Sequence, residues 1–154
     1  ADIDGDGDPD ALATSQTDRT VVVYENIPPI PAEVLGAGCA GLSLSGNPMR
    51  LNSSWDLQLG SVAATSPFGV FFVGGAALEP GLPLTATCTA YTTADLGFFL
   101  QPVVAGASTW SLAVPNDPSL VGAQLTVQGT AASADPTAWN GIAISNGLRG
   151  TVGQ

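Results

Sequence analysis

The chain has 154 residues and a formal net charge of −10, with 13 acidic residues against three basic ones and no histidine. A surface of this sign repels phosphate backbones and anionic lipids, so we expect neither nucleic acid nor a membrane as a partner. No apolar run reaches the about 18 residues of a membrane-spanning helix. Small, β-branched and turn-forming residues fill the sparsely charged remainder, which predicts an all-β fold.

The first ten residues form an acidic loop that we expect to bind Ca²⁺. Five of the 13 carboxylates lie in this loop, whose sequence is ADIDGDGDPD. Calcium takes about six to eight oxygen ligands, and carboxylates at alternating positions on a glycine-rich loop supply them. The predicted ligands are Asp2, Asp4, Asp6, Asp8 and Asp10, with Asp8 contributing its backbone carbonyl. Ala13 replaces the closing glutamate of an EF-hand, which excludes that motif; a solvated acidic tail is the alternative.

The loop and the residues after it resemble an FG-GAP/VCBS-type propeller repeat. In that family a D-x-D-G-D-G-x-x-D loop is followed by an apolar strand, a polar turn and a second strand. Here the loop is followed by Ala11–Thr14, Ser15–Asp18 and Arg19–Asn26. The resemblance implies that all five aspartates of the loop hold Ca²⁺ beside the strands. A propeller needs several blades, whereas this chain carries a fragment of one.

Residues 19–27 strongly predict a strand, because they are rich in β-branched and aromatic side chains. Three prolines at positions 28, 29 and 31 hold the following segment extended. We therefore divide the chain into an extended arm with the calcium loop and connector strand at 1–27, a Pro-rich linker at 28–33, and a β-sandwich domain at 34–154. The connector strand comprises Thr20, Val21, Val22, Val23 and Tyr24.

The connector strand carries more apolar side chain than an isolated arm leaves in water, and its unpaired edge is a template for another sheet. Docking on a neighbouring copy joins two different patches, and such a contact makes a fibre when it does not close. Docking on the strand's own domain is the alternative.

Residues 34–154 show short strands separated by Gly, Pro, Asn and Asp clusters, which predicts a two-sheet sandwich of jelly-roll or immunoglobulin-like type. Period-2 alternation is clearest at Trp55, Leu57 and Leu59. Asn146-Gly147 predicts a two-residue hairpin turn, and 117–122 predicts a helical turn. The predicted strands are Leu42–Leu44, Trp55–Val62, Val70–Val73, Leu84–Tyr91, Gly97–Val104, Thr109–Val114, Gln124–Gly129, Ile142–Ser145 and Leu148–Val152.

Three short motifs give this part of the chain a second resemblance. They are GAGC at 36–39, VPNDPSLVG at 114–122 and ISNGL at 144–148. Together they resemble a C-terminal β-domain of large secreted bacterial proteins, for which no activity is implied. The chain starts without Met or a signal peptide, so we expect a processed product or part of a longer protein.

Cys39 and Cys88 are the two cysteines of the chain. A zinc site needs further Cys or His ligands, so we expect a disulfide that stabilises the fold by about 4 kcal/mol, with two reduced core thiols as the alternative. A disulfide indicates an oxidising, extracellular location. Asn52-Ser53-Ser54 is a candidate N-glycosylation site.

Catalysis is not expected, because the chain has no histidine or lysine to activate a nucleophile. The three tryptophans are more typical of core or interface packing than of sugar stacking. Two hypotheses remain. One is an extracellular structural protein, a Ca²⁺-stiffened subunit that docks its arm on copies of itself to form a filament. The other is a carbohydrate-binding or adhesive module at the C-terminus of a larger secreted protein.

Overall fold

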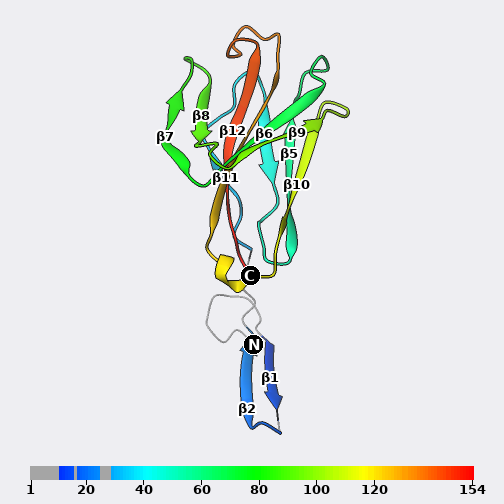
Figure 1. Ribbon diagram of the computed structural model, residues 1–154, viewed down its shortest axis with the longest axis vertical. Coiled ribbons are helices and arrows are strands. Elements are labelled where there is room, and N and C mark those ends of the chain that lie inside the picture. The colour runs from blue at the N-terminus through cyan, green and yellow to red at the C-terminus, as the bar shows by residue number, and fades with distance from the viewer. Residues whose placement is uncertain (1–10, 16, 25–28) are drawn as a thin grey trace.

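The computed structural model describes residues 11–15, 17–24 and 29–154, and these residues build antiparallel sheets and a single turn of 3-10 helix (Figure 1). No helix in these three ranges is long and apolar enough to cross a membrane. The elements are β1 (Ala11–Ser15), β2 (Thr20–Tyr24), β3 (Glu33–Leu35), β4 (Ser43–Gly46), β5 (Ser53–Gly60), β6 (Phe68–Gly74), β7 (Ala77–Pro83), β8 (Thr89–Thr92), β9 (Gly97–Pro102), β10 (Ser108–Val114), η1 (Pro118–Leu120), β11 (Gln124–Ala132) and β12 (Ile142–Thr151).

Two sheets pack face to face around the larger of two hydrophobic clusters. One has the strand order β10-β5-β4 and the other has the order β3-β12-β11-β6-β9. The predicted alternation in β5 is confirmed, because Trp55, Leu57 and Leu59 are buried while the residues between them are exposed. From the five-stranded sheet, Phe71 of β6 and Leu148 of β12 are buried in the same cluster. Burial of each such side chain contributes about 1.5–3 kcal/mol, so the contact between the two sheets is a main source of stability.

The Trp55 ring lies directly on the backbone of β12. A Cβ built on Gly150 would stand 2.7 Å from the ring, so a side chain does not fit at this position. The Trp55 Nε1 is buried and has no hydrogen-bond partner among the described residues. The tryptophan therefore contributes through packing and apolar burial.

The hairpin predicted at Asn146-Gly147 is wrong. Residues 142–151 form one continuous strand, β12, in place of two strands joined by a turn. The Leu44 N–H donates to Oδ1 of Asn146 at 2.9 Å, and Nδ2 of Asn146 donates to the Leu44 carbonyl at 3.0 Å. Asn146 is buried, and its amide bonds the edge of β4 across the gap between the two sheets. A turn signal in the sequence thus marks a polar bridge inside the sandwich.

The strand predicted at Leu84–Tyr91 is also wrong, because only its last three residues are extended. They belong to β8, which pairs with β7 as a separate two-stranded ribbon. Glu79-Pro80-Gly81, one of the Gly and Pro clusters that separate the predicted strands, lies inside β7, where the register shifts. Proline has no backbone N–H to donate to a neighbouring strand. It is tolerated here because an edge strand with a bulge leaves some backbone N–H groups unpaired. The 3-10 turn η1 appears within the predicted helical turn, and β3 begins at Glu33, the last residue of the predicted linker.

The β7–β8 ribbon covers part of the outer face of the five-stranded sheet. Tyr91 of β8 lies over Gly147 of β12, so closely that a Cβ on Gly147 would stand 2.6 Å from Tyr91 Cβ. Gln128 of β11 holds the ribbon down, because its Oε1 accepts from the Tyr91 N–H at 2.9 Å and its Nε2 donates to the Thr89 carbonyl at 2.8 Å. This contact buries β11 and β12 on both faces.

Candidate functional site

The predicted calcium ligands Asp2, Asp4, Asp6, Asp8 and Asp10 lie outside the described residues. Within residues 11–15, 17–24 and 29–154, no group of three Asp, Glu, Cys or His side chains gathers to hold a metal. The calcium site therefore remains a prediction for the acidic loop.

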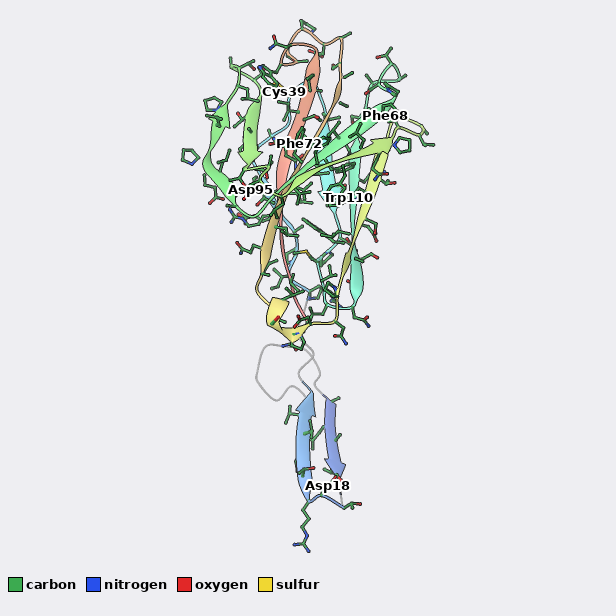
Figure 2. All side chains as sticks on the ribbon, viewed as in Figure 1. Asp18, Cys39, Phe68, Phe72, Asp95 and Trp110 are labelled. Carbon is green, nitrogen blue, oxygen red and sulfur yellow. A yellow bond between two sulfur atoms is a disulfide. The ribbon has the colours of Figure 1, made fainter. Side chains whose placement is uncertain are left out.

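The predicted connector strand forms one half of a hairpin, with β2 antiparallel to β1. Leu12 faces Val23 across the ladder and Thr14 faces Val21, so these four side chains share one side of the hairpin. Leu12 is 58% exposed and Val21 is 64% exposed. The turn is closed by Ser15, whose Oγ donates to Asp18 at 3.0 Å, and Figure 2 shows Asp18 at the tip of the hairpin.

The second side of the hairpin carries Ala13 and Val22, and Val22 is also exposed. The Thr20 side chain is exposed, whereas the Tyr24 side chain lies outside the described residues. The hairpin pairs with no other described strand, so the apolar surface on both of its sides is uncovered.

Cys39 and Cys88 form the predicted disulfide, with their Cα atoms 5.1 Å apart. The bond ties the loop before β4 to the start of β8, and both residues are buried beside Ile144 of β12. It thereby fastens the β7–β8 ribbon to the sandwich. Asn52 is exposed in a tight turn before β5, where a φ of 53° turns the chain. The glycosylation signal therefore lies on an accessible surface.

The outer face of β6 and β9 is an exposed apolar surface that the sequence-based predictions do not include. We name it the β6–β9 face. Val70 stands opposite Leu100 and Phe72 opposite Phe98, and neither strand contains a charged residue. Phe98 is 61% exposed and Leu100 is 54% exposed, whereas outer faces of antiparallel sheets are usually polar. The face comprises Phe68, Val70, Phe72, Phe98, Leu100 and Pro102.

A signal for this face is present in the sequence. FGVFFVG at 68–74 and GFFLQP at 97–102 place apolar residues at consecutive positions, and therefore on both sides of a strand. In the strand around Trp55, by contrast, apolar and polar residues alternate. A strand that is apolar on both sides is typical of burial on both faces. The inner side of β6 meets the core through Phe71 and Val73, and the inner side of β9 places Phe99 against Trp110. The second apolar side of both strands has no cover among the described residues.

A polar hollow of about 830 Å³ lies along β4, β5 and β10 of the three-stranded sheet and reaches Gln101 of β9. None of the side chains of Ser45, Gln58, Gln101 and Thr109 hydrogen-bonds another described residue, so their donors and acceptors are free. Asp56 is the single charged residue of the lining, and its Oδ1 accepts from Ser111 Oγ at 2.6 Å. The lining comprises Ser45, Gly46, Asn47, Asp56, Leu57, Gln58, Gln101, Thr109, Trp110 and Ser111.

The three tryptophans all contact apolar side chains of the fold. Trp55 is fully buried, and Trp139 packs against the disulfide cluster. Trp110 stacks on Phe99 with ring centroids 4.5 Å apart, where β10 of one sheet meets β9 of the other. Core packing is therefore confirmed for Trp55 and Trp139, whereas Trp110 is half-buried and also lines the polar hollow described above.

Three exposed aspartates have pKa values below the ordinary range, each because a nearby hydroxyl residue stabilises the charged form. The Thr93 hydroxyl and the Gly75 N–H lower the pKa of Asp95. Ser119 lowers the pKa of Asp117 and Thr137 lowers that of Asp135, in both cases through the side chain first and then the backbone. All three stand at turns, where an ionised carboxylate caps backbone donors.

The described residues thus define an all-β chain of several antiparallel sheets with one disulfide. No family model matches this chain, and neither a curated protein nor a solved structure shows significant similarity to it. The candidate sites are therefore defined by the chain's own residues and geometry.

Proposed function

We propose that this chain is an extracellular structural protein, a subunit of a fibre whose copies are joined by the N-terminal arm. The exposed apolar hairpin β1–β2 carries this proposal. Two-stranded hairpins are marginally stable in water, and this one leaves apolar side chains open on both sides. A hairpin of this kind is stabilised when it docks on another sheet.

The fibre follows from the position of the docking element. The hairpin belongs to the start of the chain, and any acceptor on the sandwich is a different patch, so the contact is heterologous. Repeating such a contact adds copies in one direction. The sandwich, of jelly-roll or immunoglobulin-like type, then forms the body of each subunit.

Calcium and the disulfide have stiffening roles in this proposal. Asp2 to Asp10 hold Ca²⁺ and order the start of the arm, because five neighbouring carboxylates repel one another without a cation. The disulfide between Cys39 and Cys88 fits an oxidising, extracellular setting.

The proposal is tested by the size of the full chain and of a variant lacking residues 1–27. We expect the full chain with calcium to sediment as long particles that negative stain shows as filaments. With a chelator the particles shorten, and the truncated chain remains monomeric in both conditions. The proposal is wrong if the full chain is monomeric with and without calcium, or if truncation leaves the particle size unchanged.

The polar hollow favours a second candidate function, the binding of a neutral carbohydrate. Free amides and hydroxyls match sugar hydroxyls, and the sparse charge suits an uncharged ligand. The β6–β9 face suits this role less, because Phe72 and Phe98 are tilted by 44° and form no flat platform for a sugar ring.

We expect Gln58→Ala to weaken binding of neutral oligosaccharides about fivefold, since one hydrogen bond contributes about 1 kcal/mol. Titration calorimetry with a panel of neutral oligosaccharides measures the effect. Ser43→Ala, which removes an exposed hydroxyl of β4 outside the hollow, is the matched control. Absence of binding by the unchanged chain across the panel would exclude this second function.

A further inference from the structure

The β6–β9 face contains a shaped apolar depression. At the Phe68 end of the face the surface is hollowed by about 330 Å³, with Val70, Leu100, Ala132 and Ile142 among the lining residues. Phe68, at this end of the face, is labelled in Figure 2 and is 50% exposed. Exposed apolar patches that are hollowed in this way are typical of protein contacts.

The same sheet already shows what covers such a surface. The β7–β8 ribbon lies on the outer face next to the uncovered part, over β11 and β12, and contributes Tyr91 to the contact. A two-stranded ribbon is therefore a cover that fits this sheet. The uncovered part, β6 and β9, is a surface two strands wide that adjoins the ribbon.

The β1–β2 hairpin has the size and chemistry of a second ribbon. Its strands have five residues each, and β7 and β8 have seven and four. The side with Leu12, Val21 and Val23 is apolar, and neither strand carries a charged residue. Copies with a net charge of −10 repel each other, so contacts between charge-free patches are the most favourable ones.

We propose that the β6–β9 face is the acceptor surface for the β1–β2 hairpin of a second copy of this chain. Leu12, Val21 and Val23 lie on the face, and one of them enters the hollow beside Phe68. The hairpin becomes a second ribbon next to β7–β8, and docking removes the β6–β9 face and the Leu12 side of the hairpin from water. This inference rests on the proposed function, and it names the surface that the arm of the fibre uses.

A second copy is favoured over the hairpin's own sandwich by the direction of the chain. Ala32 packs against the core, and Glu33 pairs with Arg149 near the end of β12. Figure 1 shows the hairpin beyond the end of the sandwich at which the C-terminus lies. Figure 2 shows Phe68 toward the opposite end, so the hairpin extends away from its own hollow.

Leu100→Asp tests the acceptor, and Ala113→Asp is its control. Both positions are exposed and receive the same charge, but Ala113 lies on the outer face of the other sheet. We expect Leu100→Asp to weaken assembly in calcium about a hundredfold, because docking then buries an unpaired carboxylate. Ala113→Asp assembles like the unchanged chain, and circular dichroism verifies that both variants fold.

Cysteine trapping identifies which copy supplies the hairpin. Copies carrying Val21→Cys are mixed with copies carrying Leu100→Cys under mild oxidation in calcium. We expect a covalent dimer containing one copy of each variant. Absence of this dimer, together with an internal cross-link in a chain carrying both changes, places the hairpin on its own sandwich and overturns the inference.

Val21→Asp separates failure of the inference from failure of the proposed function. If Val21→Asp abolishes assembly and Leu100→Asp does not, the arm joins the copies through another surface, and only the inference fails. If both variants assemble normally, the hairpin is not the connector, and the proposed function fails with it.

Discussion

Asn146→Leu is expected to lower the free energy of unfolding by about 3 kcal/mol, because it leaves two buried backbone groups of β4 without partners. The amide of Asn146 accepts from the Leu44 N–H and donates to the Leu44 carbonyl, and both residues are buried. Leucine has a similar volume and cannot replace either hydrogen bond. Urea denaturation of the variant and the unchanged chain measures the difference.

Asn47 provides a matched control for this prediction. Its Oδ1 accepts from the Asp56 N–H at 2.6 Å and its Nδ2 donates to the Ser54 carbonyl at 3.0 Å, also bonding the edge of a strand. Asn47 is exposed, so water replaces the lost bonds, and Asn47→Leu costs about 1 kcal/mol or less. The prediction is wrong if both variants lose the same free energy of unfolding, because burial would then make no difference to the contribution of the Asn146 hydrogen bonds.

Removal of the disulfide by the double change Cys39→Ala and Cys88→Ala is expected to cost about 4 kcal/mol of unfolding free energy. The two cysteines are separated by 49 positions, and opening this loop restores conformational freedom to the unfolded chain. The β7–β8 ribbon should loosen first, because the bond fastens the start of β8 to the loop before β4.

Thermal unfolding and hydrogen exchange check the disulfide prediction. Chemically reduced chain should match the double variant, which separates loss of the bond from the small loss of volume. Faster exchange at the Tyr91 N–H, which bonds Gln128, would report the loosened ribbon. A stability change below about 1 kcal/mol would contradict the chain-entropy account.

Much of the all-β fold was predictable because its signals are local. Alternation of apolar and polar residues along β5 reports which side chains face the core, and it correctly predicts that Trp55, Leu57 and Leu59 are buried. The strand at 20–24 was likewise readable from its β-branched side chains, whereas the strand at 11–15 was implied only by the resemblance to a propeller repeat. The disulfide followed from the presence of only two cysteines, since each had one available partner.

The errors arose where distant segments decide the conformation. Asn146-Gly147 has the composition of a hairpin turn, but Leu44, far away in the sequence, offers hydrogen bonds that keep the strand continuous. Glu79-Pro80-Gly81 resembles a turn and is extended, because β8 pairs beside it in an edge ribbon. Local propensity is a small free energy, and tertiary contacts override it.

Some candidate surfaces could be predicted from neighbouring residues, and others form only when distant segments pair. The acidic loop and the connector strand are recognisable from the sequence, because the candidate calcium ligands and the apolar strand each consist of neighbouring residues. The β6–β9 face is not, because residues 68–72 and 98–102 become one surface only when β6 pairs with β9 and the ribbon β7–β8 covers their neighbours. Composition and period thus establish an all-β chain with an acidic start, and only the tertiary structure selects which apolar side is left uncovered, since exposure depends on what packs above a strand.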